Sequence, residues 1–312
     1  MGKPIVVFGS FVVDLTGRTE GLPLPGQTIL GKSFRMGAGG KGSNQAVAAY
    51  QAGANVTLVT KLGTDMLAHI AVDFYEKEGM DTRYILRDKE QGTGVALIIV
   101  DEGSAQNEIV VIPGACNHIT MQDVEKCRTL IENASILLLQ HEINFDAQRA
   151  VLEIAYQAGV RIVLNPAPAV PIPDDVFGKI DTITPNETEA QVLTGIEVTS
   201  LESAQEAANV FVEKGVKNVV ITMGSLGAFA TDGRNCELLP RLNVDCIDTT
   251  GAGDAFNGGF VTALSEGKTL FEALRFGNAT GALSVTKHGT APSMPKREEI
   301  AAMIRENYGR DI

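Results

Sequence analysis

Residues 248–260 read Asp248-Thr249-Thr250-Gly251-Ala252-Gly253-Asp254-Ala255-Phe256-Asn257-Gly258-Gly259-Phe260, and they predict the end of a strand, a glycine-rich turn and then a helix. Gly251 and Gly253 allow the backbone to turn sharply and to approach a ligand closely. A helix that begins near Ala252 aims several unpaired N–H groups and the positive end of its dipole at that turn. Such a helix start binds anions, so the stretch predicts an anion site between a strand and a helix.

Asp254 lies in the first turn of this predicted helix, and its carboxylate has two possible roles. A negative side chain there can cap the helix and offset its dipole. It can also act as a base that takes a proton from a hydroxyl group while the N–H groups receive a phosphoryl group. A Gly-Ala-Gly-Asp turn is a short motif, so the stretch alone leaves both roles open.

The composition is that of an acidic globular protein. The chain has 312 residues, 44% of them hydrophobic, with a formal net charge of −12 and a pI of about 4.9. That length is sufficient for a large core. An acidic surface repels nucleic acid and anionic membranes, so neither is expected as a partner. A phosphorylated ligand would need a locally positive site built from helix ends, a few lysines or a metal ion.

The cysteines and the first residues predict a cytoplasmic protein. The four cysteines are Cys116, Cys127, Cys236 and Cys246. They show no zinc-site spacing, so we expect buried free thiols in a reducing compartment. The apolar run Ile5-Val6-Val7-Phe8-Gly9 is too short for a signal peptide and is typical of a first strand. No apolar stretch reaches the length needed to span a membrane.

From about residue 120, the predicted helices and strands alternate regularly. This alternation predicts a doubly wound α/β fold, in which a mainly parallel sheet is flanked by helices. Two pieces, about 15–36 and 93–112, contain turns and short β-prone runs that do not follow this alternation. We expect them to form a small sheet that projects from the main domain. No linker or repeat indicates a second domain, so residues 1–312 are expected to form one domain.

Glycine-rich or polar stretches follow several of the predicted strands. Gly39-Gly40-Lys41-Gly42-Ser43-Asn44 matches neither the Walker pattern nor the dinucleotide fingerprint. It is either a tight turn before a helix or a substrate loop in which Lys41 and Asn44 hydrogen-bond a polar ligand. Glu142 ends another apolar strand, and Asn165-Pro166-Ala167-Pro168-Ala169 ends the next. In open α/β sheets, ligands bind at the carboxyl ends of the strands.

Asn186 and Glu189 follow Pro185, which ends a further strand. Three residues apart, they share one face of a helix. They are either a helix cap with acidic residues in the first turn, or a phosphate-facing amide and a carboxylate that holds Mg²⁺ through water. The loop from Thr222 to Gly227 follows a fifth strand, and its glycines and hydroxyl groups are suited to phosphate.

Four of these stretches resemble the ribokinase family of carbohydrate kinases. They are Gly39-Gly40-Lys41-Gly42-Ser43-Asn44-Gln45-Ala46, Asn165-Pro166-Ala167-Pro168-Ala169, Asn186-Glu187-Thr188-Glu189 and Asp248-Thr249-Thr250-Gly251-Ala252-Gly253-Asp254, in the family's order. The resemblance implies a kinase that phosphorylates the 5-hydroxyl group of a pentose with ATP and Mg²⁺, activated by a monovalent cation, usually K⁺. It also implies that the pieces at 15–36 and 93–112 form a β-sheet lid that joins two chains in a homodimer.

The resemblance also implies roles for individual residues. Asp254 matches the catalytic base, and Gly251, Ala252 and Gly253 match the anion hole. The matches to sugar-binding positions are Asp14, Gly40, Lys41, Asn44 and Glu142. The matches to ATP-binding positions are Asn186, Thr222, Met223, Gly224, Ser225, Leu226, Gly227, Gly253 and Asn278. Glu189 matches a residue associated with Mg²⁺. The matches to the monovalent-cation site are Asp248, Thr250, Ser284, Lys287, Gly289 and Ser293.

Val12 departs from the family pattern. The family typically carries Asn two residues before the aspartate of its first motif, here Asp14, where it helps to bind sugar hydroxyl groups. An apolar side chain cannot do so, and an unpaired hydroxyl group in a buried site costs about 1–3 kcal/mol. We expect D-ribose as the acceptor, with 2-deoxy-D-ribose as the alternative that Val12 favours. A repacked site, in which water or another side chain serves the same hydroxyl group, is also open.

Two other functions remain as alternatives. A nucleoside or hexose-phosphate kinase of the same superfamily is one. Hexose phosphates need extra basic residues, however, and Lys41 is the only obvious one in the sugar motifs. The other is a sugar- or nucleotide-sensing protein on the same fold, against which Asp254 and the pair Asn186 and Glu189 argue.

Overall fold

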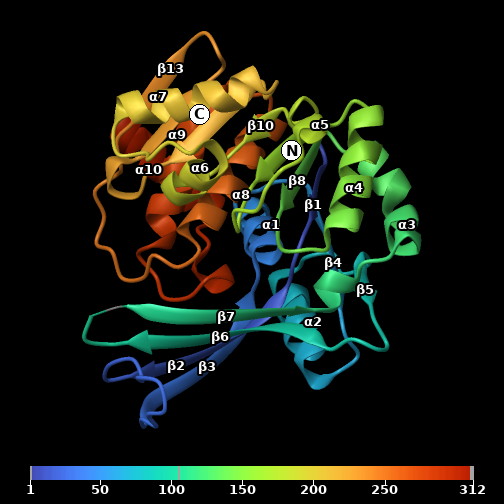
Figure 1. The fold of residues 1–312 in the computed structure, drawn as a ribbon, viewed down its shortest axis with the longest axis vertical. Coiled ribbons are helices and arrows are strands. Elements are labelled where there is room, and N and C mark those ends of the chain that lie inside the picture. The colour runs from blue at the N-terminus through green and yellow to red at the C-terminus, as the bar shows by residue number, and fades with distance from the viewer. Residues whose placement is uncertain (1, 105, 310–312) are drawn as a thin grey trace.

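The computed structural model describes residues 2–104 and 106–309, which form a larger and a smaller sheet (Figure 1). The larger sheet has nine strands in the order β13-β12-β11-β10-β9-β8-β1-β4-β5. The strands from β11 to β5 run parallel, whereas β12 is antiparallel to β11 and to β13. The strands are β1 (Ile5–Phe8), β4 (Val56–Leu62), β5 (Ile85–Arg87), β8 (Ile136–Gln140), β9 (Arg161–Asn165), β10 (Thr182–Ile183), β11 (Asn218–Thr222), β12 (Ala228–Thr231) and β13 (Cys236–Leu239). The expected mainly parallel sheet is confirmed.

Helices cover both faces of the larger sheet (Figure 1). Successive side chains of a strand point to opposite faces, and β1 shows this. Ile5 and Val7 pack in the core shared with α1, α2, α8, α9 and α10, whereas Val6 and Phe8 pack in the core shared with α3 to α7. The helices are α1 (Lys41–Gln51), α2 (Met66–Glu78), α3 (Met121–Glu132), α4 (Phe145–Gln157), α5 (Asp174–Phe177), α6 (Glu187–Thr194), α7 (Leu201–Glu213), α8 (Ala252–Ser265), α9 (Leu270–Ser284) and α10 (Arg297–Tyr308), with 3-10 turns η1 (Ala115–His118), η2 (Gly224–Leu226) and η3 (Ala291–Ser293). The doubly wound α/β fold is therefore confirmed.

A four-stranded sheet projects from one end of the molecule (Figure 1). Its order is β3-β2-β6-β7, with β2 (Val12–Thr19), β3 (Gly31–Gly39), β6 (Thr93–Asp101) and β7 (Asn107–Gly114). We call it the lid sheet, although its closing motion remains a prediction. Its strands extend beyond the expected pieces, because β2 begins soon after β1 ends and β3 runs almost directly into α1. The sheet is therefore continuous with the loops at one edge of the larger sheet.

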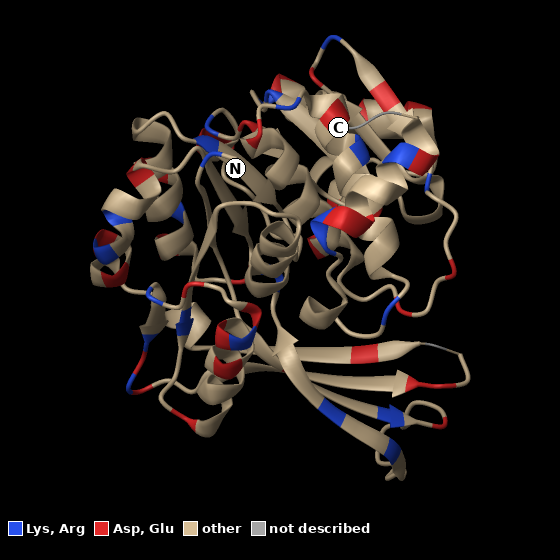
Figure 2. Ribbon diagram, turned by 180° about the vertical axis from the view of Figure 1, so that it is seen from behind, with Lys and Arg blue, Asp and Glu red and all other residues tan. Residues whose placement is uncertain are grey.

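Charged residues lie mainly on the outer helices, the loops and the lid sheet (Figure 2). On the lid sheet, Arg18 and Arg35 lie on β2 and β3, and Glu108 lies on β7. The two helices at the centre are almost free of charge: Lys41 is the single charged residue of α1, and Asp254 is that of α8. Both stand in the first turn of their helix. Buried charges are costly, so the central pair indicates a site rather than a solvated face.

Asp14 lies within β2, where it pairs with Gly37 of β3. One expectation about individual residues was wrong in part. All the cysteines are free thiols, but Cys236 and Cys246 are exposed, so the expectation of burial holds only for Cys116 and Cys127. Within residues 2–104 and 106–309, no helix has the length and hydropathy needed to cross a bilayer.

Candidate active site

The first turn of α8 leaves backbone amides unpaired. Gly251 precedes the helix with a φ of 80°, a left-handed conformation that favours glycine. The Ala252 amide donates to Thr249, but the Gly253 and Asp254 amides have no partner in the described chain. Gly253 is exposed, and the space beside it is open, because a Cβ placed there would meet nothing within 4 Å. These free donors and the helix dipole suit a phosphoryl group.

The carboxylate of Asp254 points toward α1 and not along its own helix. Its Oδ2 accepts a hydrogen bond of 2.9 Å from Asn44 Nδ2, and its Oδ1 accepts one of 2.9 Å from Gln45 Nε2. It makes no capping hydrogen bond to α8. The side chain is 7% exposed. The geometry therefore disfavours a local cap and leaves a buried carboxylate beside the unpaired amides.

The start of α1 packs very closely against the end of β1. A Cβ at Gly42 would lie 2.6 Å from the carbonyl carbon of Gly9, so no other residue fits there without a backbone shift. Gly40, with a φ of 89°, precedes the helix. The Lys41 amide then donates to Glu142 Oε2 at 2.9 Å, and Ser10 Oγ donates to the same oxygen at 2.5 Å. The glycine-rich loop thus brings the predicted sugar residues of α1 next to Glu142, which follows β8.

Asn44 has an unsatisfied polar atom that faces this site. Its Nδ2 is used by Asp254, whereas its Oδ1 is buried and has no hydrogen-bond partner in the described chain. An unpaired buried acceptor costs about 1–3 kcal/mol, so such atoms indicate a missing ligand. A hydroxyl group of a sugar would supply the donor. The residues present therefore fit a polyhydroxylated acceptor.

Three carboxylates face Lys41. Burial by itself lowers the pKa of Lys41, but the charges of Asp254, Glu142 and Glu189 outweigh burial and raise it. Burial raises the pKa of Glu142, and it raises that of Asp14 to about 6. Carboxyl groups with raised pKa values in one place are typical of functional sites.

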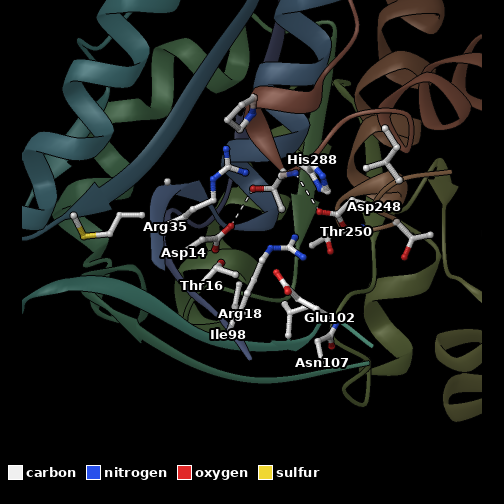
Figure 3. Close-up of a pocket in the computed structure, with 18 of the residues that line it drawn as sticks. Asp14, Thr16, Arg18, Arg35, Ile98, Glu102, Asn107, Asp248, Thr250 and His288 are labelled. Atoms are coloured by element: carbon white, nitrogen blue, oxygen red, sulfur yellow. Dashed lines mark hydrogen bonds between the residues drawn. The ribbon is translucent and has the colours of Figure 1, made fainter. Parts of the chain in front are cut away.

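Asp14 borders a cavity of about 570 Å³ between the lid sheet and the main domain (Figure 3). Thr290 Oγ1 donates to Asp14 Oδ2 at 3.0 Å and thereby links the lid to the loop after α9. Arg18 and Arg35 of the lid also line the cavity. Neither arginine belongs to a sugar motif, so Lys41 remains the only obvious basic residue within those motifs. The residues shared by the cavity lining and the predicted site are Asp14, Asp248, Thr250 and Gly289, whereas Asp254 does not line the cavity.

Val12 lies on β2 two residues before Asp14, on the same face of the strand. Its side chain is 4% exposed. It pairs with Gly39 and Gly94, which carry no side chains. Val12, the residue that departs from the family pattern, is thus a buried apolar neighbour of Asp14.

The predicted nucleotide residues form a second group at the strand ends. Asn186 and Glu189 make a capping box, in which Glu189 Oε2 accepts from the Asn186 amide at 2.9 Å and Asn186 Oδ1 accepts from the Glu189 amide at 2.8 Å. Asn186 forms a bridge with Thr222, so the two loops lie side by side. The helix-cap interpretation of this pair is correct, and it leaves Glu189 Oε1 free of the cap. Burial raises the pKa of Glu189.

Two of the predicted nucleotide-binding residues have side chains that are already buried or hydrogen-bonded within the protein. The Met223 side chain is 1% exposed in the core, so only its backbone can meet a ligand. Asn278 donates to the Pro240 carbonyl at 2.9 Å and to the Tyr308 hydroxyl at 3.0 Å, which fixes its amide on α9. Gly224, Ser225 and Leu226 are exposed, whereas Gly227 is buried.

The predicted monovalent-cation residues meet in two facing loops. Asp248 accepts from the Thr250 amide at 3.0 Å and from the Gly289 amide at 3.2 Å. Burial raises the pKa of Asp248, but these hydrogen bonds outweigh it and lower the pKa. The side chains of Ser284, Lys287 and Ser293 donate to Gly281, Glu299 and Thr290, respectively. The Lys287 ammonium cannot bind a cation, so this residue could contribute only its backbone oxygen, whereas the two serines keep lone pairs on their hydroxyl oxygens. No group of three or more His, Cys, Asp or Glu in the described residues is arranged to hold a metal ion.

Sequence reasoning gave no role to several residues of the site. Ser10 holds Glu142, Thr290 holds Asp14, and Gln45 holds Asp254. Gln45 and Asn165 stand inside motifs quoted above, but their partners are far away in the chain, so only the fold reveals them. Ser10 and Thr290 carry common hydroxyl side chains and belong to no pattern that could have singled them out.

Comparisons with known proteins agree with this geometry. Residues 3–297 match the model of the pfkB family carbohydrate kinases. The chain is 42% identical to a ribokinase of Haemophilus influenzae, over 96% of this chain and 97% of that protein. It is 34% identical to a deoxyribokinase of Salmonella typhi, over 97% and 99%. A solved structure of Arabidopsis thaliana ribokinase complexed with ribose and ATP superposes with a TM-score of 0.89 at 32% identity, over 98% and 99% of the two chains.

Proposed function

Since the chain belongs to the pfkB family of carbohydrate kinases, we propose that it transfers the terminal phosphoryl group of ATP to the 5-hydroxyl group of D-ribose. It is a phosphotransferase with an alcohol group as acceptor. The similarity to ribokinases over nearly the whole chain supports ribose as the first acceptor. The similarity to a deoxyribokinase, together with Val12, supports 2-deoxy-D-ribose as the second.

The observation that carries the proposal is the buried carboxylate of Asp254 beside the unpaired amides of α8. In the reaction, the sugar oxygen forms a bond to the γ-phosphorus as the bond to the bridging oxygen of ATP breaks and ADP leaves. Asp254 accepts the proton of the sugar hydroxyl, a role typically worth about 10²–10⁴ in rate. The Gly253 and Asp254 amides donate to the oxygens of the transferring group.

The remaining residues bind and orient the two substrates. Asp14, Glu142 and the Asn44 Oδ1 accept hydrogen bonds from sugar hydroxyl groups, and Lys41 donates. The loops at Asn186 and from Thr222 to Gly227 hold the nucleotide, with Asn278 near its base. Closing the lid sheet excludes water, which otherwise competes with the sugar for the phosphoryl group.

Two ions fit the residues that are present. Glu189 has one carboxylate oxygen free of its helix cap and is suited to hold Mg²⁺ through water, since Mg²⁺ prefers few carboxylates and several waters. When bound, Mg²⁺ offsets the charge of the ATP phosphates. Hydrogen bonds to the Asp248 carboxylate hold the loops at Asp248 and Gly289 together, and backbone oxygens of such loops would suit K⁺. Activity in potassium chloride that is no higher than in lithium chloride would contradict this second site.

The test of function is sugar-dependent release of ADP by the purified protein with ATP and Mg²⁺. D-ribose, 2-deoxy-D-ribose, a nucleoside and a hexose phosphate should be compared by kcat/KM. We expect ribose to give the highest value, with the 5-phosphate as product. Binding of sugar or nucleotide without turnover of any acceptor would instead indicate a sensing protein. The hexose phosphate belongs in the set because Arg18 and Arg35 line the cavity beside Asp14.

Replacing Val12 by Asn should raise the preference for ribose over 2-deoxyribose. The new amide supplies a partner for the 2-hydroxyl group, which is worth about 1–3 kcal/mol and corresponds to roughly 5- to 150-fold in the ratio of kcat/KM values. The matched control is Val12→Ala, which changes the side chain without supplying a hydrogen-bonding group and should leave the ratio close to that of the parent. An unchanged ratio in Val12→Asn would show that this position does not set the preference.

We also propose that the lid sheet joins two chains in a homodimer. The exposed apolar side chains on the face of the lid away from Asp14 are Phe34, Met36, Leu97, Val110 and Ile112, between 45% and 63% exposed. Because they alternate with the residues that face the cavity, they form one continuous apolar surface. Apolar surfaces of this kind typically mark interfaces. The sheet would thereby bury its apolar face against a second copy.

Glutamate at Met36 and Val110 together should convert the dimer to a monomer. Two buried charges without partners would oppose association. Sedimentation velocity should then give the 33.1 kDa of one chain, and twice that mass for the parent. Leu24→Glu is the matched control, because Leu24 is 70% exposed but lies in the loop between β2 and β3. A parent protein that is already monomeric at micromolar concentration would refute the proposal.

A further inference from the structure

Gln45 connects Asp254, the proposed base, to the ends of β8 and β9 through hydrogen bonds. The roles proposed above for the site do not require these hydrogen bonds. It lies on α1 directly after Asn44 and is completely buried. Its Nε2 donates to Asp254 Oδ1 and to Asn165 Oδ1, both at 2.9 Å. Its Oε1 accepts from Gln140 Nε2 at 2.6 Å. Every hydrogen-bonding atom of its amide is therefore in use.

The direction of these hydrogen bonds is fixed by a backbone carbonyl. The Thr184 carbonyl can only accept, so Asn165 must present its Nδ2 to it, at 2.9 Å. That orientation turns Asn165 Oδ1 toward Gln45, which must then donate with its own Nε2. The same Nε2 reaches Asp254. The polarity of the Gln45 amide is thus set by the ends of β9 and β10 and not by the carboxylate itself.

The two helices that carry this contact cannot separate freely. Gly258 lies one turn after Asp254 on α8, and a Cβ there would approach Ala48 Cβ to 2.4 Å and the Gln45 carbonyl oxygen to 2.7 Å. Such close approach of two backbones requires glycine. On α8 itself, Asn257 Nδ2 donates to the Gly253 carbonyl at 2.8 Å and Asn257 Oδ1 accepts from Thr184 Oγ1 at 2.6 Å. Thr184 thus contacts α8 through Asn257 as well as the network through Asn165.

Gln45 and Asn44 hold different positions relative to the ligand. Asn44 has a buried acceptor atom without a partner, which suits contact with a sugar hydroxyl group. Gln45 has no atom left for a ligand and lies behind Asp254 at 0% exposure. Loss of Asn44 should therefore weaken sugar binding, whereas loss of Gln45 should leave binding unchanged and affect the proton-accepting carboxylate.

We propose that Gln45 is a positioning residue, which transmits the fixed geometry of the strand ends to Asp254 and holds its Oδ1 in the orientation that accepts the proton of the sugar hydroxyl. The inference rests on the proposed kinase function. Precise placement of a base matters because a displacement of about 1 Å can cost roughly 100-fold in rate. The proposal predicts that the loss of Gln45 lowers kcat and has little effect on the KM for the sugar.

Two variants of Gln45 test this proposal. Gln45→Leu removes both donors at similar volume and should lower kcat by about 10- to 100-fold, with the sugar KM within about threefold of the parent. Gln45→Glu replaces the donor by an acidic oxygen next to Asp254, and two adjacent carboxyl groups share a proton. The acid limb of its kcat–pH profile should therefore move to higher pH. Gln148→Leu is the matched control, because Gln148 is buried in α4, and its kcat should match that of the parent.

The pH profile separates positioning from a merely structural role. The charged groups that face Asp254 are Asp14 of β2, Lys41 of α1, Glu142 after β8 and Glu189 of α6. None of them changes in these variants, so a displaced limb reports the carboxyl group introduced at position 45. A structural role would lower the melting temperature or the active fraction and leave the limb in place.

A crystal structure of Gln45→Leu gives a readout that does not depend on turnover. It should show the Asp254 carboxylate rotated away from its position in the parent. If the parent turns over no acceptor, the proposed function fails, and this structure still decides whether Gln45 positions Asp254. An unmoved carboxylate overturns the proposal, as does an unchanged kcat in folded Gln45→Leu or a raised sugar KM with unchanged kcat. If Gln45→Leu does not fold, the pH limb of Gln45→Glu decides.

Discussion

Replacing Asp254 by Asn should lower kcat by about 10²–10⁴-fold while sugar binding remains measurable. The substitution keeps the shape of the side chain and the contact with Asn44 or Gln45 but removes the proton acceptor. Turnover should be followed by ADP release, and the sugar Kd by calorimetry without ATP. Asp73→Asn is the matched control, because Asp73 is exposed on α2.

The same variant separates the two roles that the sequence left open for Asp254. A residue that only caps α8 would lower the free energy of unfolding by about 0.5–2 kcal/mol when lost and leave kcat nearly intact. The structure shows no capping hydrogen bond from Asp254, so we expect the opposite pattern. Near-normal turnover by Asp254→Asn would refute its assignment as the base.

Replacing Lys61 by Met should lower the free energy of unfolding by about 3–5 kcal/mol, since the loss of one partner leaves buried charges unpaired. Lys61 Nζ lies 2.8 Å from Asp88 Oδ2, 2.9 Å from Asp123 Oδ2 and 2.8 Å from the His118 carbonyl oxygen, and its side chain is 5% exposed. These partners lie after β5, in α3 and in η1. Urea unfolding measures the change. The matched control is Lys217→Met, which removes an ion pair of a 69% exposed lysine and should cost at most about 1 kcal/mol.

The decrease in the free energy of unfolding caused by Lys61→Met should be smaller at low pH. Burial raises the pKa of Asp123, but hydrogen bonds from Lys61 and Thr120 outweigh it and lower the pKa to about 2. Lys61 likewise lowers the pKa of Asp88 to about 2. Their contribution to stability is complete above the unfolded-state pKa of about 3.9 and is lost as the pH falls through 2. The stability difference between parent and variant should therefore narrow between about pH 4 and pH 2, and a constant difference would contradict the ion-pair account.

The fold can be predicted from the sequence because the patterns that indicate helices and strands involve residues close together in the chain. Regular βα alternation is enough to infer a doubly wound sheet, and the apolar faces of β1 follow from period two. Short elements such as β5 and β13 carry too few residues for a periodic signal. The full length of β2 and β3 was also missed, because strand pairing in the lid sheet extends each strand beyond its own β-prone core.

Individual residues of the site could be predicted from the sequence only where they belong to a recognisable motif. Asp254 and Glu142 stand at motif positions, and the structure brings both to the strand ends next to Lys41. The choice between cap and base for Asp254 needed the direction of its side chain, which depends on α1. The hydrogen bonds of Gln45 involve partners from β8, β9 and α8. Arg18 and Arg35 border the cavity beside Asp14 only because β2 and β3 pair in the lid sheet. Contacts between distant segments have no signature in a single sequence.

The origin of the lid sheet in the chain has a consequence for how such enzymes diverge. Every lid strand comes from residues 12–114, whereas the carboxylate and the free amides that we propose act on the phosphoryl group come from the start of α8. On this proposal, substitutions at Val12, Arg18 or Arg35 can change the acceptor without disturbing the groups that transfer the phosphoryl group. The acceptor and the transfer chemistry would then evolve separately. A duplicated gene for such a chain can acquire a new acceptor in small, individually viable steps.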